Sequence, residues 1–478
     1  MTMVGLNAST RGPERQPLWP SLIVHYPSRA AGLPRNGGLF EPEALVKRIL
    51  LLTALVGMIS PVAFCQNMFR GNPARTGVYA TDGPHQFNGV KWAFKTDGWV
   101  LSSSALAGGL VYFGSEDKNL YALDVATGEE KWRFSTGGPV RSSPAVVAGT
   151  VYFGSYDSSF YALDAASGKL KWKFETAGEK QFEAKGLHGY LPRAQNMPDP
   201  WDFFLSSPAV NDGLVYFGSG DGNLYALDSK TGHLKWKFVT QGVVHSSPAV
   251  AGGVVYFGSW DSYLYALDAA TGQVKWEFKT GEDWTNFNQV GIQSSPAVDG
   301  GVVYFGCRDA HLYALDAGTG KQKWNFDSHG SWINTSPAIY EGAAYVGTPI
   351  PGLFGAVDTK TGQVRFHLDA RMMVFSSAAV AGGMAYFGSF NGKLYAVDLK
   401  TGQFAWEFQT QAGKRDALGI VGPDGRPDFK AIFRSKFYED MCSAVERLFS
   451  LGSIVSSPTV EGGVIYVGST DGNLYALE

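Results

Sequence analysis

This chain of 478 residues contains few cysteines and carries little net charge. It contains three cysteines, Cys65, Cys307 and Cys442, and its formal net charge at pH 7 is −3. A nearly neutral chain argues against a nucleic-acid partner held by phosphate contacts. Because Cys65 falls in an N-terminal apolar run, only Cys307 and Cys442 could form a bridge in an oxidising compartment, and we expect two separate thiols.

Patterns typical of catalytic chemistry are also missing. No Ser-His-Asp arrangement and no Cys-x-x-Cys-His motif occurs. Four histidines come from separate loops and show no metal-ligand spacing. They are His188, His245, His311 and His329. The sequence therefore contains no recognisable catalytic constellation.

After residue 65 no apolar run is long enough to span a bilayer, so we expect no membrane span in the mature chain. Residues 1–45 are rich in Pro and Arg and lack periodicity, which predicts an unstructured segment or one that lies upstream of the true start of translation. Residues 46–65 have the charged start and short apolar core of a secretory signal peptide. The alternative is a genuine tail ahead of an uncleaved anchor.

We therefore expect a periplasmic or secreted protein. An outer-membrane lipoprotein with lipid on Cys65 is the less favoured alternative, because Phe64 stands where lipoprotein signals have a small residue.

One unit repeats through the rest of the chain, and residues 246–280 show it clearly. This stretch, SSPAVAGGVVYFGSWDSYLYALDAATGQVKWEFKT, reads as four short strands separated by turn residues. In YLYALD both alternating sets of side chains are apolar or small, so each sheet must be covered on both faces. Units of about 40 residues with four strands and a fixed Trp predict a β-propeller.

Eight units predict an all-β, eight-bladed propeller of four-stranded antiparallel blades over residues 90–478. The units start at Ser102, Ser142, Ser206, Ser246, Ser294, Thr335, Ser376 and Ser456. The eighth unit stops after its third strand, and residues 91–96, KWAFKT, match the missing fourth strand. We therefore expect this N-terminal strand to close the ring. Residues 66–89 form a polar lead-in, which we expect along the outside of the ring.

Three insertions interrupt the repeat, at 177–205, 281–293 and 411–455. Each lies between the fourth strand of one blade and the first strand of the next. All three should therefore emerge on one face of the ring, here called the mouth face, where binding loops are expected. In the last insertion apolar residues recur every four positions from Phe429 to Phe449, which predicts an amphipathic helix of about twenty residues. This helix is either a cap packed on the propeller, or a lid or partner-binding helix.

Positions that depart from the repeat are the candidates for a binding site, because recurring residues are structural. The position just before each first, channel-lining strand holds Leu101, Arg141, Leu205, His245, Gln293, Asn334, Phe375 and Val455. The four polar members could form a pocket together with Arg308, His311, His329, Trp284 and Trp332. Such a pocket of donors and aromatic planes would suit a flat, anionic ligand, and solvated channel residues are the alternative. The recurring Asp residues at the turns are expected to fix those turns.

The strings YALDAATGQVKWEF and SSPAVAGGVVYFGS resemble the repeat of pyrroloquinoline quinone (PQQ) enzymes, whose fourth-strand Trp docks against the neighbouring blade. The segment FRGNPARTGVY, at 69–79, looks like the lead-in of such bacterial propellers. Two branches share the repeat: quinoprotein dehydrogenases, which bind PQQ and calcium on the mouth face, and non-enzymatic propellers similar to the outer-membrane assembly lipoprotein BamB. The dehydrogenases typically carry a vicinal Cys-Cys pair, and this chain has none.

The sequence favours a non-enzymatic, extracytoplasmic scaffold that is monomeric and binds an envelope protein through the mouth-face insertions. The alternatives are a PQQ-dependent oxidoreductase for alcohols or sugars and PQQ binding without turnover, and both imply PQQ with calcium as cofactor. The candidate cofactor contacts are Arg141, His245, Gln293, Asn334, Trp284, Trp332 and Arg308. No metal ligand and no catalytic residue is assigned.

Overall fold

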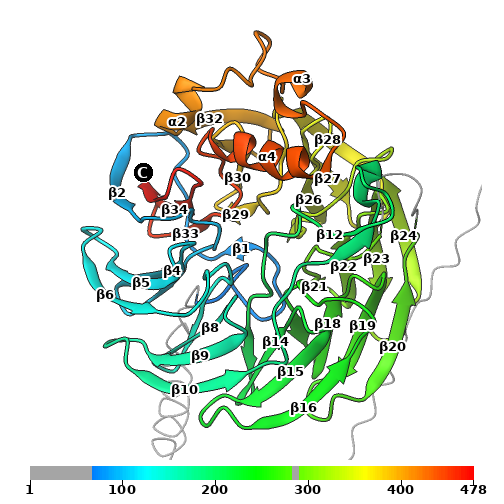
Figure 1. Cartoon of the computed structure of the whole chain (residues 1–478). Helices are drawn as coiled ribbons and strands as arrows, with labels where there is room; N and C mark the ends of the chain where they lie inside the picture. Colours follow the sequence, from blue (N-terminus) through cyan, green and yellow to red (C-terminus); the bar gives the residue numbers. More distant parts are fainter. Residues whose placement is uncertain (1–66, 283–289) are drawn as a thin grey trace, which may run out of the picture. The chain divides into compact units, whose positions relative to one another are not determined.

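The structure, a computed structural model, describes residues 67–282 and 290–478 and confirms the eight-bladed propeller (Figure 1). Each blade is a four-stranded antiparallel sheet, and the first strands of neighbouring blades meet around a central channel. Blade 7 has a fifth strand, β1 (Val78–Tyr79), which pairs in parallel with β29. The predicted tail and signal peptide, residues 1–65, lie outside the described residues, as does Trp284.

The first four blades follow the chain in order. Blade 1 holds β3 (Ala105–Ala107), β4 (Leu110–Gly114), β5 (Asn119–Asp124) and β6 (Glu130–Ser135). Blade 2 holds β7 (Ala145–Val147), β8 (Thr150–Ser155), β9 (Ser159–Asp164) and β10 (Leu170–Glu175). Blade 3 holds β13 (Ala209–Asn211), β14 (Leu214–Gly218), β15 (Asn223–Asp228) and β16 (Leu234–Val239). Blade 4 holds β17 (Ala249–Ala251), β18 (Val254–Gly258), β19 (Tyr263–Asp268) and β20 (Val274–Lys279).

The other four blades complete the ring. Blade 5 holds β21 (Ala297–Asp299), β22 (Val302–Gly306), β23 (His311–Asp316) and β24 (Gln322–Asp327). Blade 6 holds β25 (Ala338–Tyr340), β26 (Ala343–Gly347), β27 (Leu353–Asp358) and β28 (Val364–Asp369). Blade 7 holds β29 (Ala379–Ala381), β30 (Met384–Gly388), β31 (Lys393–Asp398) and β32 (Gln403–Gln409). Blade 8 holds β33 (Thr459–Glu461), β34 (Val464–Gly468), β35 (Asn473–Leu477) and β2 (Val90–Lys95), so the N-terminal strand closes the ring as predicted.

Two residues at the start of every unit tie the propeller together. In blades 1, 3, 4, 5, 6 and 8 the hydroxyl of the first accepts a hydrogen bond from the second strand of its own blade, as Ser102 does from the Gly114 N–H at 2.8 Å. The hydroxyl of the second accepts from the matching serine N–H of the preceding blade, as Ser143 does from Ser103 at 3.0 Å. This contact recurs at every junction and ends between the Ser457 N–H and the Ser103 hydroxyl, so it forms a closed ring.

The tryptophan of a fourth strand packs on the next blade, as the resemblance implied. Trp132 Nε1 donates to Ala165 O at 3.1 Å, and the Trp132 ring lies over Gly168. Gly168 has φ +68°, and a Cβ built there would lie 2.7 Å from the ring. Glycine is therefore required at this turn both by the left-handed backbone and by the ring above it.

The prediction that the lead-in lies along the outside of the ring is wrong for residues 67–79. Carbonyl groups of residues 67–77 accept hydrogen bonds from first-strand N–H groups of blades 2, 4, 5, 6 and 7, near the Ala-Gly-Gly turns. The fully buried Arg75 donates to Pro248 O and, at 2.7 Å, to Ser207 O. The first strands are edge strands whose outer backbone groups need partners, and the lead-in supplies them at the channel end opposite the mouth face.

The described parts of the insertions cover the mouth face. The first insertion contains β11 (Glu183–Lys185), η1 (Leu187–Gly189) and β12 (Asn196–Pro198). The last insertion contains α2 (Gln411–Arg415), α3 (Phe429–Ile432) and α4 (Tyr438–Phe449). The two insertions pack together, because Leu187 and Met197 from the first share an apolar cluster with Met441 from the last.

One continuous helix of about twenty residues does not form, which corrects the prediction. Residues 433–437 separate α3 from α4, and their backbone is engaged elsewhere. The Asp440 carboxylate accepts hydrogen bonds from the N–H groups of Arg434 and Ser435, at 2.6 and 2.8 Å. The Lys436 carbonyl accepts from the Leu191 N–H of the first insertion. These contacts replace helical hydrogen bonds, so the periodic pattern continues across a break.

The buried face of α4 is a cap on the ring. Ala444, Leu448 and Phe449 pack in one apolar cluster with Phe203 of the first insertion and Phe390 of blade 7. Of the two roles predicted for the last insertion, its packing therefore supports the cap.

Candidate functional site

The structure brings the four predicted polar residues together at the mouth end of the channel. Arg141, His245, Gln293 and Asn334 line one small cavity of about 40 Å³, together with the eight serines of the closed ring. The polar residues predicted at the channel-lining position therefore lie around one cavity. Arg308 and Trp332 lie in a separate cluster beside it.

His245 is buried between two carboxylates from the first insertion. Its Nδ1 lies 2.8 Å from Asp202 Oδ1, and its Nε2 lies 2.9 Å from Glu179 Oε1. Burial disfavours the imidazolium, but Asp202 and Glu179 outweigh it and raise the pKa of His245 to about 10. Asp202 also accepts from the Phe182 N–H at 2.7 Å, and Glu179 from the Gly220 N–H at 2.6 Å. A protonated His245 thus ties both ends of the insertion to blade 4.

Arg308 forms a second contact of the same kind. It is fully buried, and its Nη1 lies 2.6 Å from Asp199 Oδ2. Its guanidinium lies 3.8 Å from the ring centroid of Trp332 and 4.7 Å from that of Trp260. Burial alone would raise the pKa of Asp199, but Arg308 and then His188, 3.2 Å away, hold it well below its usual range.

Arg141 is paired as well. It forms an ion pair with Glu116 of blade 1, donates to Phe203 O at 3.3 Å and lies over the Tyr156 ring. Burial opposes its charge, yet Tyr156 and Glu116 raise the pKa of Arg141 above its ordinary value. The three cations predicted to attract an anion are thus neutralised within the protein.

The two amides are less fully paired. Gln293 donates from Nε2 to Trp201 O at 3.0 Å, and its Oε1 has no hydrogen-bond partner among the described residues. Both polar side-chain atoms of the buried Asn334 likewise have none there. Only a small polar guest such as water fits beside them, because the cavity is so small.

These residues do not fit a flat, anionic quinone. Arg141, His245 and Arg308 each already hold a carboxylate of the chain. A cavity of about 40 Å³ also lies far below the roughly 300–1,000 Å³ of ordinary ligand sites. Within residues 67–282 and 290–478, no group of three or more His, Cys, Asp or Glu is arranged to hold a metal ion.

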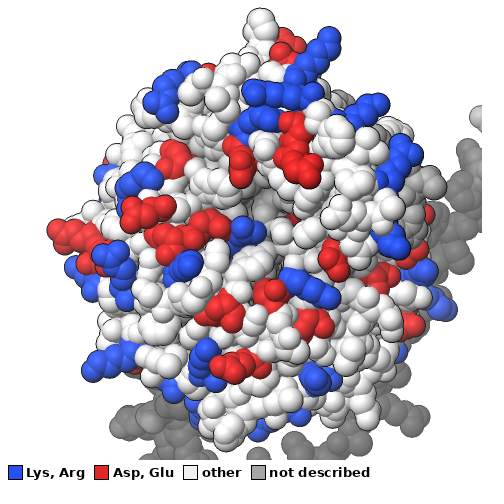
Figure 2. All heavy atoms as spheres, viewed as in Figure 1, with Lys and Arg blue, Asp and Glu red and all other residues white. Residues whose placement is uncertain are grey.

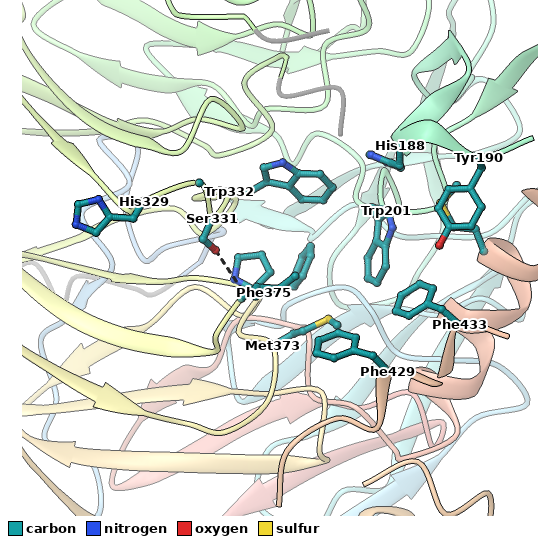
Figure 3. Close-up of a pocket in the computed structure, with 14 residues that line it drawn as sticks. His188, Tyr190, Trp201, His329, Ser331, Trp332, Met373, Phe375, Phe429 and Phe433 are labelled. Carbon is teal, nitrogen blue, oxygen red and sulfur yellow. Dashed lines mark hydrogen bonds between the residues drawn. The ribbon is translucent and has the colours of Figure 1, made fainter. Parts of the chain in front are cut away.

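A larger cavity of about 480 Å³ opens on the mouth face, and we call it the aromatic groove (Figure 3). Its walls come from the first insertion, the blade 5 to blade 6 connection, the turn between β26 and β27, the loop before β29 and the last insertion. The lining residues are His188, Tyr190, Trp201, His329, Gly330, Ser331, Trp332, Pro349, Ile350, Met373, Phe375, Phe429, Phe433 and Met441. No Asp, Glu, Lys or Arg is among them.

The groove is partly prearranged. Ser331 Oγ accepts a hydrogen bond from the Ile350 N–H at 3.2 Å, which is the dashed line of Figure 3. Trp201 stacks on Phe375 with a centroid distance of 5.8 Å and an interplanar angle of 19°. Of the predicted pocket residues that the structure describes, His329 and Trp332 line this groove.

The carboxylates that pair with the mouth cations were not predicted from the sequence. Glu179, Asp199 and Asp202 lie in the first insertion, and Glu116 follows β4. A signal existed for Glu116, Trp260 and Arg308, since all three occupy the same variable position after the second strand of their unit. The acids of the insertion have no repeat register, so only the structure assigns their partners.

Both remaining cysteines are free thiols, Cys307 buried and Cys442 partly so, as expected for separate side chains. Burial, the largest effect, raises the pKa of Cys307 well above its ordinary value. No helix in the described part of the chain is long and apolar enough to cross a membrane.

Comparison with solved structures shows the same fold in proteins of different function. BamB from Moraxella catarrhalis is 15% identical with a TM-score of 0.60, covering 82% of this chain and 99% of that one. A europium-containing methanol dehydrogenase is 15% identical with a TM-score of 0.62, covering 86% and 98%. A quinohemoprotein alcohol dehydrogenase from Comamonas testosteroni is 16% identical with a TM-score of 0.62, covering 86% and 80%. At such identities the likeness concerns the fold alone.

No curated protein matches the sequence. The family described as outer membrane protein assembly factor BamB matches residues 82–187, 194–291 and 281–478, which is most of the chain. The blade repeat, the closing strand and this match agree, and the chain belongs to the BamB family of PQQ-repeat propellers.

Proposed function

We propose that this protein is a non-enzymatic, extracytoplasmic scaffold that binds another protein of the cell envelope through its mouth face. The family and its BamB member support a role in protein interaction. The apolar core of the sequence stretch 46–65 supports export to the periplasm or beyond.

The observation that carries this proposal is the pairing of the mouth cations with the chain's own acids. In a PQQ enzyme with this repeat the mouth would have to accept an anionic quinone and calcium. Here Glu179, Asp199 and Asp202 occupy the positions around His245 and Arg308 that such a ligand would need. Among the described residues this face is capped instead, and an apolar groove of the kind that suits protein side chains opens on it.

A cofactor titration separates this scaffold from a quinoprotein. The full chain is titrated with PQQ and calcium while thermal stability and quinone absorbance are followed. A tight ligand raises the melting temperature by mass action, so a scaffold should show no shift at excess cofactor. Saturable binding that disappears in Arg141→Ala would overturn the proposal in favour of a quinoprotein.

A second experiment tests the partner. The tagged full chain is cross-linked in envelope extracts, in parallel with Phe437→Glu and Val364→Glu. Phe437 is 56% exposed beside the cap, whereas Val364 is 45% exposed and follows a Thr-Gly turn, away from the mouth face. One envelope protein should be captured by the wild type and Val364→Glu and lost in Phe437→Glu. Equal capture by all three would refute binding through the mouth face.

A further inference from the structure

We propose that the aromatic groove binds a peptide segment of a partner protein that presents aromatic side chains flanked by acidic residues. This inference rests on the proposed scaffold function and adds the chemistry of the bound segment. No part of it requires a cofactor.

The size and lining of the groove set the kind of side chain that it takes. Its volume of about 480 Å³ falls within the range of ordinary binding sites. Six of its fourteen lining residues are aromatic and two are methionines. Aromatic rings pack favourably against such a lining, and methionine sulfur adapts to them.

The ring surfaces of the groove are held from behind. Trp332 rests on the buried Arg308 guanidinium, which Asp199 fixes in turn. The backbone N–H of Trp201 donates to Asp199 Oδ1 at 2.9 Å, and the Trp201 ring stacks on Phe375. A guest therefore meets surfaces that lose little freedom when it binds.

The apolar surface continues beyond the groove. Ile350 and Phe429 line it and are 55% and 45% exposed, respectively. Leu191, next to the lining residue Tyr190, is 38% exposed and bridges to Phe437, which is 56% exposed. Large apolar side chains gathered in this way mark interaction surfaces. An occupant that covers both the groove and this rim must be longer than a small molecule, which favours a peptide.

The charge of the rim selects the residues that flank the aromatic side chains. The stretch 429–437, FKAIFRSKF, contains Lys430, Arg434 and Lys436 and no acid, and all three cations are exposed. None of them forms a side-chain ion pair among the described residues. Asp428, Glu439 and Asp440 flank the stretch, and Asp428 and Asp440 accept hydrogen bonds from its own backbone. Figure 2 shows Lys and Arg side chains over the α2 and α3 region of this face, with Asp and Glu side chains beside them toward α4. Acidic residues of a partner therefore meet complementary charge.

Peptide binding to the full chain tests the proposal directly. The probe is the fluorescein-labelled heptapeptide Asp-Glu-Trp-Ala-Phe-Glu-Asp, followed by fluorescence anisotropy. One control peptide has both aromatic residues replaced by Ala, and another has every acid replaced by Lys. Both control peptides should bind with an affinity at least about tenfold lower than that of the probe. Added salt should lower the affinity of the probe.

Protein variants locate the site. The double variant Phe429→Ala with Phe433→Ala should lower probe affinity about tenfold. The double variant Lys430→Glu with Arg434→Glu should bind the acidic probe more weakly than the wild type does, and the Lys peptide more tightly. Phe404→Ala on β32 is the matched control, since that ring is 39% exposed and lies outside the groove, and it should bind like the wild type. All these side chains are at least partly exposed, so melting temperatures should stay close to that of the wild type.

Several results would overturn the inference. The first is no probe binding up to about 1 mM, and the second is equal binding by the wild type and the Phe429→Ala with Phe433→Ala variant. The third is binding of phosphatidylglycerol vesicles through the same residues without binding of the probe, which would assign the groove to a membrane surface. If this variant still captures the envelope partner of the wild type, the scaffold stands and the groove assignment fails. If the probe binds but no envelope partner exists, the groove chemistry stands and the proposed function fails.

Discussion

The stability of this propeller should depend on the charge of His245, and the dependence has a definite sign. His245 lies between Asp202 and Glu179, and its pKa in the folded state is about 10 against about 6.5 in an unfolded chain. The folded state thus binds one more proton than the unfolded state between these pH values. This contribution to stability is fully present below pH 6.5 and is lost as the pH rises through about 10.

The magnitude follows from proton linkage. One extra bound proton makes the free energy of unfolding fall by about 1.4 kcal/mol per pH unit within that window. In His245→Gln the part of this slope that comes from His245 should vanish, because the variant has no imidazole to bind the extra proton. The variant should also be less stable at pH 7 by about 3–5 kcal/mol, since two buried carboxylates lose their cation.

Urea unfolding at several pH values from 6.5 to 9.5, followed by tryptophan fluorescence, measures both effects. The comparison concerns the difference in slope between the wild type and His245→Gln, so lysines, tyrosines and cysteines that titrate equally in both proteins cancel. His233→Gln is the matched control, because His233 is exposed in a turn of blade 3. Equal pH slopes in the wild type and His245→Gln would refute the assignment of a protonated His245.

Three further tests follow from the buried contacts. In a double-mutant cycle, Arg308→Met and Asp199→Asn should each lower the free energy of unfolding by about 3–5 kcal/mol. The coupling energy between the two substitutions should exceed about 2 kcal/mol, and additive losses would contradict the ion pair. Arg75→Met should cost about 3 kcal/mol in urea unfolding because channel carbonyls lose their donor, and an unchanged midpoint would place the lead-in elsewhere. Gly128→Ala should lower the melting temperature more than Gly108→Ala, since its Cβ would lie 2.6 Å from the Trp92 ring whereas nothing lies within 4 Å at Gly108. Equal shifts would refute the packing.

The propeller was predictable because its information is local and repeated. Two faces of apolar residues in YLYALD require neighbours on both sides, and a missing fourth strand at Leu477 requires one from residues 91–96. Each of these inferences needs only a short stretch of chain and the rule that sheets bury their faces and edges.

The lead-in and the last helix were not predictable in the same way. The position of Arg75 depends on carbonyl groups in two distant blades, and nothing in FRGNPARTGVY identifies them. The break between α3 and α4 depends on Asp440 and on a backbone contact with Leu191, which lies more than two hundred residues away. Long-range polar contacts leave no period in the sequence, so hydrophobic periodicity continued where the helix did not.

The candidate site shows the same division. Departure from the repeat located Arg141, His245 and Arg308 around one mouth, because a propeller brings equivalent positions to one axis. The charge of their partners could not be predicted from the repeat, because Asp199 and Asp202 lie in an insertion that has no position in the repeat. Variable positions in a repeat thus indicate where a contact is made, but they do not identify the partner residue.

The buried acids of the first insertion do two things at once. By pairing with His245 and Arg308 they remove the positive field that an anionic cofactor would need, and they fix the insertion on the ring. Fixing the insertion also builds the groove, because the Trp201 backbone N–H donates a hydrogen bond to Asp199 and the Trp332 ring lies on Arg308. Loss of the Arg308 charge should therefore loosen both walls of the groove together. In this propeller the residues that would attract a cofactor instead hold the surface that a partner would contact.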